Sequence, residues 1–268
     1  MLDFFTSLYT QGASYSAVNT AKSALLTFVT VRDNENWNLD PDIRKFFKGY
    51  FNLRTPIPRY FFSWDVDIVL TYLDNFFPLG LISLKELTFK ALTLVALSSG
   101  SRAQALHLMD LSYMTRTPRK LTFYFKRILK TSKPGKVPHV LDINAFDNPT
   151  RCVFTTLSEY ITRTENLRQS SELWVSFQKP FKPITKQTIS RWLKTTLGNA
   201  GIDTNVFSGH STRMASTSKA AQQGLDIQSI LKTADWSSAK NFATFYKRDV
   251  VPDEKALFSQ TILGSGGK

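Results

Sequence analysis

The sequence predicts a mainly helical α+β fold, in which a small all-α domain precedes a larger domain that contains a small antiparallel sheet. Three observations support this prediction. Apolar residues recur at helical spacing through most of the 268-residue chain, strand-like alternation is concentrated in residues 121–143, and a proline-containing segment at 54–59 separates the helical start from the rest. A chain of this length can bury a substantial core in one or two domains.

The first fifty residues are predicted to form three helices. These helices lie near residues 2–9, 17–31 and 41–50. Ser16 is a candidate cap for the second helix, because its hydroxyl can accept a hydrogen bond from a backbone N–H of the first turn. Pro41 suits the first turn of the third helix, where its missing N–H has no partner to lose.

Residues 54–59 are predicted to link two domains. Pro56 and Pro58 forbid a continuous helix and favour extended backbone in the residues before them. We therefore expect a helical domain at residues 1–55 and the larger domain at residues 56–268. A loop within a single domain is the alternative interpretation of this segment.

The larger domain is predicted to consist of helices around one hairpin. Residues 63–65 are candidates to cap a helix that runs to about residue 75, and the apolar helix at 84–98 stops at Gly100. Apolar and polar side chains alternate over residues 121–126, and a partner strand returns at 137–143 after a basic turn. Further along the chain we predict helices at 148–163, 185–199, 211–223 and 227–232 and a short strand at 173–177.

The charge balance predicts a polyanionic partner. Lysine and arginine number 34 against 21 acidic residues, which gives a net charge of +13 and a pI near 9.8. Such a surface favours nucleic acid, or less often an anionic membrane surface, and a merely basic soluble protein is the alternative. The single cysteine, Cys152, excludes an internal disulfide and a thiolate metal cluster. No apolar run reaches membrane-spanning length, and the three histidines show no metal-ligand spacing.

Six residues, in chain order, carry the groups that a metal-independent phosphoryl transfer requires. They are Arg102, Lys130, His210, Arg213, Trp236 and Tyr246. His210 and Arg213 stand three positions apart on a predicted helix, so both side chains can reach one phosphate. Each of the six residues has a commoner structural role when it is considered alone, but independent core roles would not generate this order.

Each of these groups has a chemical task. The two guanidiniums would bind the charge that grows on the non-bridging phosphate oxygens, and the lysine, at the hairpin turn, would protonate the leaving sugar oxygen. The imidazole would hydrogen-bond the phosphate or help take the tyrosyl proton, and the indole N–H would donate to a phosphate oxygen. The tyrosine would attack the phosphorus and form a covalent phosphotyrosine.

The order resembles the motif of the tyrosine recombinases, the phage-type integrases, which is Arg, Lys, His-x-x-Arg, His or Trp, and then Tyr. The resemblance covers residues 60–250. Within that group, residues 207–216 and 234–238, followed by Phe245-Tyr246, are most similar to the DIRS-type and Crypton-type transposon recombinases of eukaryotes.

This resemblance implies a site-specific DNA recombinase or integrase, which cleaves and rejoins DNA strands through a covalent 3′-phosphotyrosine. It implies the tyrosine recombinase catalytic fold for the larger domain and a helical, SAM-like core-binding domain, carried only in part, for residues 1–55. The implied partners are double-stranded DNA and further copies of the chain, as a dimer or tetramer, with residues 252–263 docking on a neighbour. The implied location is the nucleus, and no cofactor, metal, membrane or small-molecule substrate is expected.

The chain departs from the family pattern at identifiable positions. Ala105 stands three after Arg102, where family members often carry an acidic residue, and Trp236 replaces the commoner histidine. Ten positions separate Trp236 from Tyr246, a length that looks typical of the eukaryotic transposon branch. Three other hairpin lysines compete with Lys130 for the general-acid role: Lys126, Lys133 and Lys136.

Cations outside the six residues predict phosphate contacts that give DNA affinity without sequence choice. The candidate DNA-binding residues are Lys133, Lys136, Lys186, Gln187, Ser190, Arg191 and Lys194. The helix predicted at 185–199 is a candidate for insertion into a DNA groove, and a solvated helix face is the alternative.

Two further functions remain open from the sequence. A domesticated or truncated remnant would bind DNA without recombining it, which Ala105 and the short N-terminal region suggest. A relaxase similar to type IB topoisomerases would use the same nucleophile chemistry on supercoiled DNA.

Overall fold

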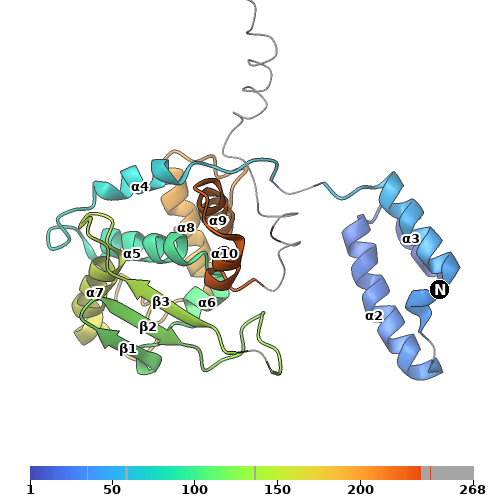
Figure 1. Cartoon of the computed structure of the whole chain (residues 1–268), viewed down its shortest axis with the longest axis horizontal. Coiled ribbons are helices and arrows are strands. Elements are labelled where there is room, and N and C mark those ends of the chain that lie inside the picture. Colours follow the sequence, from blue (N-terminus) through green and yellow to red (C-terminus); the bar gives the residue numbers. More distant parts are fainter. Residues whose placement is uncertain (35, 58–59, 136, 237–241, 243–268) are drawn as a thin grey trace, which may run out of the picture. The chain divides into compact units, whose positions relative to one another are not determined.

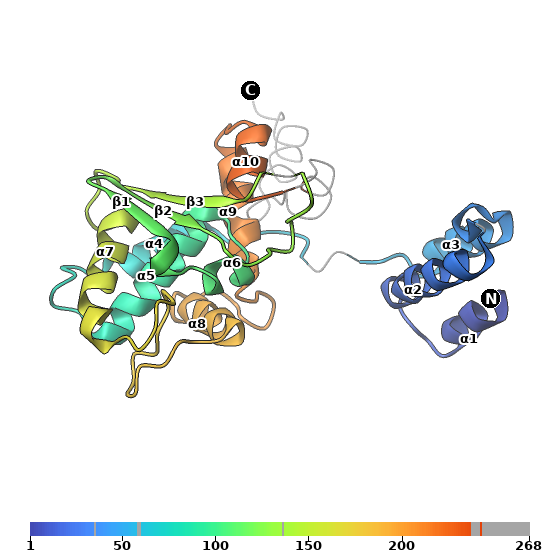
Figure 2. The same ribbon diagram turned by 90° about the horizontal axis from the view of Figure 1, so that it is seen from below.

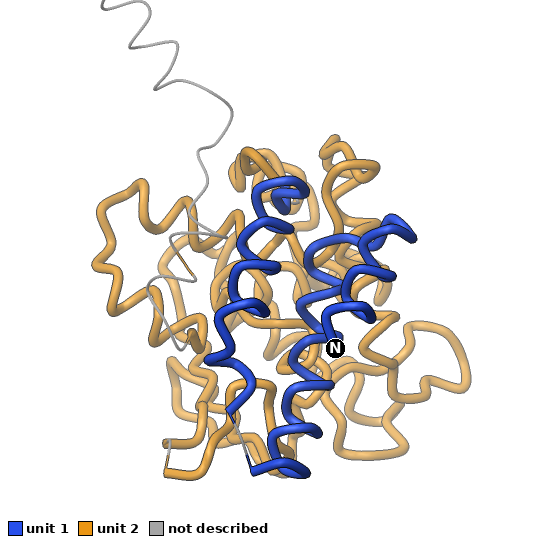
Figure 3. Tube along the Cα trace, turned by 90° about the vertical axis from the view of Figure 1, so that its right-hand side faces the viewer, with its two compact units in different colours: residues 1–59 blue, residues 60–268 orange. Residues whose placement is uncertain are grey.

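The computed structural model describes residues 1–34, 36–57, 60–135, 137–236 and 242. The chain forms two compact units, Met1–Arg59 and Tyr60–Lys268, which Figure 3 colours separately. The sequence placed the division after residue 55, and the units divide after Arg59. Within the described ranges, no helix has the length and apolar character needed to cross a membrane.

Unit 1 is a small helical unit with its own aromatic core. Its elements are α1 (Leu2–Thr10), α2 (Tyr15–Asp33), the 3₁₀ turn η1 (Trp37–Leu39) and α3 (Pro41–Leu53). The cap of α2 is Ser14, which accepts from the N–H of Ala17 at 3.2 Å, so the prediction of Ser16 was wrong by half a turn. Phe5 and Phe47 meet edge to face in the core, with ring centroids 5.1 Å apart.

Unit 2 is built around a buried helix, α5 (Leu84–Ser99). Its N-terminus carries a reciprocal capping box between Ser83 and Glu86, and every residue from 87 to 97 is buried. The other helices are α4 (Val66–Asp74), α6 (Ala103–His107), α7 (Val153–Thr164), α8 (Lys186–Asn199), α9 (Ser211–Gln222) and α10 (Ile227–Thr233), with 3₁₀ turns η2 (Leu111–Tyr113) and η3 (Glu165–Leu167). A helix that is apolar all round is central in a core, and α5 contacts α7, α8 and α9.

A three-stranded antiparallel sheet, in the order β1-β2-β3, covers one side of this core (Figures 1 and 2). Its strands are β1 (Met114–Thr117), β2 (Lys120–Tyr124) and β3 (Val140–Asn144). Leu121 pairs with Ile143 and Phe123 with Leu141, and all four side chains are buried toward α5 and α7. The predicted mainly helical α+β class with a small antiparallel sheet is therefore confirmed.

Two local predictions were wrong and two short elements were missed, each for a physical reason. The predicted strand at 173–177 contains one isolated bridge, from Val175 to Pro183, which has no N–H to extend a ladder. Helix α7 begins at Val153 instead of residue 148, because Asn148 forms a turn by accepting from the N–H of Thr150 at 3.0 Å. Strand β1 and helix α6 were not predicted, since segments of four and five residues carry little periodicity.

Candidate active site

The start of α9 is clamped against the core. The indole N–H of Trp64 donates to the hydroxyl of Ser211 at 2.9 Å, and that hydroxyl donates to the carbonyl of Ser208 at 2.7 Å. Gly209 approaches α8 so closely that a Cβ there would lie 2.4 Å from the carbonyl oxygen of Ser190. These contacts fix the first turn of α9, which carries His210 and Arg213.

Arg213 is a buried cation with a defined direction. Its side chain is only 1% exposed, and one guanidinium nitrogen donates to the carbonyl of Gly100 at 2.6 Å. The guanidinium carbon lies 4.3 Å from the ring centroid of Trp236, which is a cation–π distance. The Gly100 carbonyl and the Trp236 ring together fix the orientation of the guanidinium.

The residues after α5 bring a second guanidinium, that of Arg102, near the same Trp236 ring. Gly100 ends α5 with a φ of +56°, and a Cβ there would lie 3.2 Å from the Cβ of Ala234 and 3.3 Å from the Cγ2 of Thr217. The chain therefore turns tightly beneath α9 and α10. Arg102 then donates to the backbone carbonyl of Asp235 at 3.4 Å, and its guanidinium carbon lies 5.9 Å from the Trp236 ring centroid.

The end of α10 presents Trp236 through a Schellman motif. The N–H of Trp236 donates to the carbonyl of Leu231 at 2.8 Å, and the N–H of Asp235 donates to the carbonyl of Lys232 at 3.3 Å. Asp235 occupies the left-handed position of this motif with a φ of +51°, where glycine is usual. The motif turns the chain so that Trp236 lies beside both arginines.

The connection between β2 and β3 supplies the amine. Leu129 is buried, and the N–H of Lys130 donates to the side-chain oxygen of Gln104 at 3.1 Å. The hydroxyl of Thr131 donates to the carboxylate of Asp235. Lys130 itself has an exposed side chain between these two held neighbours.

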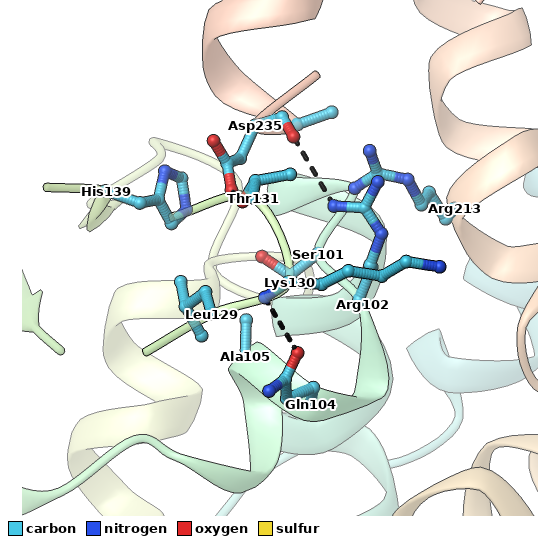
Figure 4. Close-up of a pocket in the computed structure, with 11 residues that line it drawn as sticks. Ser101, Arg102, Gln104, Ala105, Leu129, Lys130, Thr131, His139, Arg213 and Asp235 are labelled. Carbon is cyan, nitrogen blue, oxygen red and sulfur yellow. Dashed lines mark hydrogen bonds between the residues drawn. The ribbon is translucent and has the colours of Figure 1, made fainter. Parts of the chain in front are cut away.

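These elements line one small, open cleft (Figure 4). Its lining residues are Ser101, Arg102, Gln104, Ala105, Leu129, Lys130, Thr131, His139, Arg213, Ala234 and Asp235. Three of the predicted cations, Arg102, Lys130 and Arg213, therefore converge on one small cleft. Such a set can bind an oxyanion and stabilise added negative charge on it.

The remaining predicted catalytic residues stand differently. His210 is the exposed N-cap residue of α9, so burial separates it from Arg213 despite the helical spacing. Tyr246 and Lys136 lie outside the described residues. Lys126 lines a different groove beside Tyr113, whose hydroxyl raises the pKa of that lysine through a hydrogen bond, and Lys133 is exposed in the turn. The catalytic roles of all six residues remain predictions.

Five polar cleft residues were missed in the sequence: Ser101, Gln104, Thr131, His139 and Asp235. His139 stacks on Phe125 with ring centroids 5.7 Å apart and an interplanar angle of 12°. A usable signal existed for Asp235 alone, since a helix that ends at Thr233 calls for a left-handed residue soon after it.

The candidate DNA-binding residues of α8 lie mostly on its solvent face. Lys186, Gln187, Arg191 and Lys194 are exposed, and Ser190 is half-buried beneath Gly209. The opposite face of α8 packs into the core through Ile189, Trp192, Leu193 and Leu197. The DNA-contact role of this exposed face remains a prediction.

Comparison with known proteins gives one family and one fold. The phage integrase family matches residues 77–250, which is more than half of the chain. No curated protein matches. Among solved structures, the chain is similar to the XerH site-specific recombinase bound to a palindromic difH substrate, with a TM-score of 0.67 and 15% identity over 98% of this chain and 71% of that one.

Two further structures show the same fold. The Tn1549 transposon integrase in complex with transposon right end DNA has a TM-score of 0.61 and 12% identity, over 98% of this chain and 84% of that one. A lambda integrase dimer bound to a COC′ core site has a TM-score of 0.56 and 14% identity, over 92% of this chain and 63% of that one.

Proposed function

This chain belongs to the phage integrase family, and from that premise we propose that it is a site-specific DNA recombinase acting through a covalent 3′-phosphotyrosine. The observation that carries the proposal is the convergence of Arg102, Lys130 and Arg213 on one cleft. Asp235 also lines this cleft, and Trp236 is the next residue in the chain. A scissile phosphate is a group that matches this charge.

The cleavage step assigns each group one task. The phenol oxygen of Tyr246 attacks the phosphorus, the bond to the 5′ oxygen breaks, and Lys130 donates its proton to that leaving oxygen. The phosphorus stays on the 3′ oxygen, now esterified to tyrosine. Arg102 and Arg213 hold the non-bridging oxygens, whose charge is greatest in the transition state. His210 takes the proton that the phenol loses, and rejoining is the reverse reaction.

The partners we propose are duplex DNA and other copies of the chain. The similar XerH and Tn1549 structures are DNA complexes, and lambda integrase is seen both as a dimer on a core site and as a tetramer on a Holliday junction. The net charge of +13 suits a polyanion. We propose the same assembly here, with exchange of strands between protomers.

A transposon origin and a nuclear location complete the proposal. Support comes from residues 207–216 and 234–238, which resemble the DIRS-type and Crypton-type recombinases, and from the structural similarity to the Tn1549 transposon integrase.

A trapping experiment tests the function directly. A nicked substrate, whose cleaved strand end diffuses away, should leave the protein covalently joined to DNA, and Tyr246→Phe should abolish this adduct. The adduct is measured as a shift on a denaturing gel. An adduct that persists in Tyr246→Phe would refute the assignment, and salt-sensitive binding without any adduct would support a DNA-binding remnant instead. Relaxation of supercoiled plasmid without a sequence requirement would indicate a topoisomerase-like activity.

The exposed face of α8 yields a binding prediction. Lys194→Ala, on that face, should weaken DNA binding about equally for all sequences and reduce the slope of log K against log salt by about one. Fluorescence anisotropy over a salt series measures both quantities. Lys85→Ala, at the start of α5, is a matched lysine control outside this face, and an identical slope change there would remove α8 from the interface.

A further inference from the structure

We propose that Asp235 is a positioning residue, which ties the loop carrying Lys130 to the helix end that presents Trp236. Thr131 is its partner in this contact. The inference rests on the proposed function, since the task it assigns is to hold the general acid at the scissile phosphate.

The first support is the way the Lys130 loop is held. On its N-terminal side, Leu129 is buried and Gln104 contacts the backbone twice, accepting from the N–H of Lys130 at 3.1 Å and donating to the carbonyl of Ile128 at 3.4 Å. On its C-terminal side, the hydroxyl of Thr131 donates to the carboxylate of Asp235, which lies 104 residues further along the chain. Lys130 is the exposed residue between two anchors, so its backbone is set while its amine stays available.

The second support is the identity of the residue at the end of α10. Asp235 adopts a φ of +51° in the Schellman motif, a conformation that glycine accepts without cost and that an aspartate adopts at a cost of about 1 kcal/mol. Glycine would serve the helix end better. The carboxylate offsets that cost by accepting from Thr131, which a glycine cannot do.

The third support is that Asp235 touches the other parts of the site as well. Its backbone carbonyl accepts from Arg102 at 3.4 Å (Figure 4). Its peptide bond continues into Trp236, whose ring lies beside Arg213. Asp235 therefore connects the loop that carries Lys130, the proposed general acid, with the arginines that would bind the phosphate. The acidic side chain in the cleft comes from the end of α10. On α6, at the position where family members often carry an acidic residue, this chain has Ala105.

The test uses the chemistry of the leaving group. A substrate with sulfur in place of the 5′ bridging oxygen leaves as a thiolate, which needs no proton, because a thiol is far more acidic than a sugar hydroxyl. A defect in positioning the general acid should therefore disappear on the sulfur substrate. A general loss of folding or of phosphate binding should persist on both substrates.

The variants are chosen to keep the fold. Thr131→Val removes the hydroxyl at constant shape, and Asp235→Gly removes the carboxylate while suiting the backbone. Asp235→Asn keeps an acceptor and tolerates the left-handed conformation. Thr122→Val is the matched control, since Thr122 donates to the carboxylate of Asp142 at 2.7 Å on the same hairpin, away from the cleft.

We expect Lys130→Ala to slow cleavage of the oxygen substrate by about 10²–10⁴-fold. Thr131→Val and Asp235→Gly should slow it by about tenfold or more, with the rate restored on the sulfur substrate. Asp235→Asn and Thr122→Val should remain near the wild-type rate. The double variant Lys130→Ala/Thr131→Val should be no slower than Lys130→Ala, because the contact acts only through that lysine.

Two outcomes would overturn the inference. One is a wild-type rate for Thr131→Val and Asp235→Gly on the oxygen substrate, and the other is an equal defect on both substrates. Backbone hydrogen exchange of residues 128–132 in the full chain tests the contact between Thr131 and Asp235 independently of catalysis. Thr131→Val and Asp235→Gly should speed this exchange several-fold, and Thr122→Val should not. If the wild-type chain forms no Tyr246 adduct, the proposed function fails, and unchanged exchange would separately refute the contact.

Discussion

Two helix ends in unit 2 each hold a buried cation, and they use it differently. At the end of α4, Lys90 is 0% exposed and donates to the carbonyls of Leu73 and Phe76 at 3.0 and 2.8 Å. At the end of α5, Arg213 is 1% exposed and donates to the carbonyl of Gly100 at 2.6 Å. In both places a cation binds carbonyls at or just beyond the C-terminal end of a helix, where the helix dipole is negative.

The difference between the two ends lies in what surrounds the cation. Lys90 has a carboxylate nearby, Asp74, which is itself held by Arg151 at 2.6 Å, and burial lowers the pKa of the lysine. Arg213 lines a cleft with two more cations, Arg102 and Lys130, and with the carboxylate of Asp235. A carboxylate held beside the buried lysine indicates a structural role, and an excess of cations that folding alone does not favour indicates a ligand with negative charge.

The largest effect is expected at the α5 end. Arg213→Lys should reduce the single-turnover rate of adduct formation by about 10²–10³-fold, because an ammonium cannot serve the Gly100 carbonyl and a phosphate in the same planar geometry. The rate is measured by quenching the trapping reaction over time. Near-normal cleavage in this variant would make the α5 end a structural site like the α4 end.

The next effect is expected at the α4 end and in stability alone. Lys90→Met keeps the shape but leaves two carbonyls without their donor, which should lower the free energy of unfolding by about 1–3 kcal/mol. The rate of adduct formation by the folded protein should not change. Urea denaturation, paired with the trapping assay, measures the two quantities, and a loss of cleavage without a loss of stability would reverse the comparison.

The same lysine gives a prediction on pH. Its pKa in the folded chain is lowered by burial, so just below the ordinary lysine pKa the unfolded chain binds more protons than the folded one. Stability should therefore rise with pH across that window in the wild type, and Lys90→Met should lack this rise. Denaturation midpoints on both sides of the window measure the difference.

The smallest effect is expected from Asp74→Asn. The hydrogen bond from Arg151 is the main cause that lowers the pKa of Asp74, so the carboxylate stabilises the fold above its ordinary pKa, and that stability is lost as pH falls through the lowered value. Because the pair is 30–36% exposed, we expect only about 0.5–1 kcal/mol. Urea denaturation at neutral and acidic pH should show a smaller acid loss in Asp74→Asn than in the wild type.

Much of the fold was predictable because its signals are local. The largely apolar run and Gly100 defined α5, and alternation at Leu121 and Phe123 defined the hairpin. The strand predicted at 173–177 failed because pairing depends on a partner, and its partner is a proline. His210 and Arg213 stand three positions apart in the sequence, but only the packing of α9 shows that His210 is exposed and Arg213 is buried.

The amino-acid sequence alone determined the six candidate residues, the basic character and the helical α+β class. Motif spacing, charge and periodicity are all properties of the linear chain. Folding decided that Lys130, and neither Lys126 nor Lys133, lines the cleft, and which acid lies beside it. Lys130 enters because Leu129 is buried and Thr131 reaches Asp235, a contact across 104 residues that no local pattern encodes. Such contacts depend on how α5, α9 and α10 pack together, and only the tertiary structure specifies that packing.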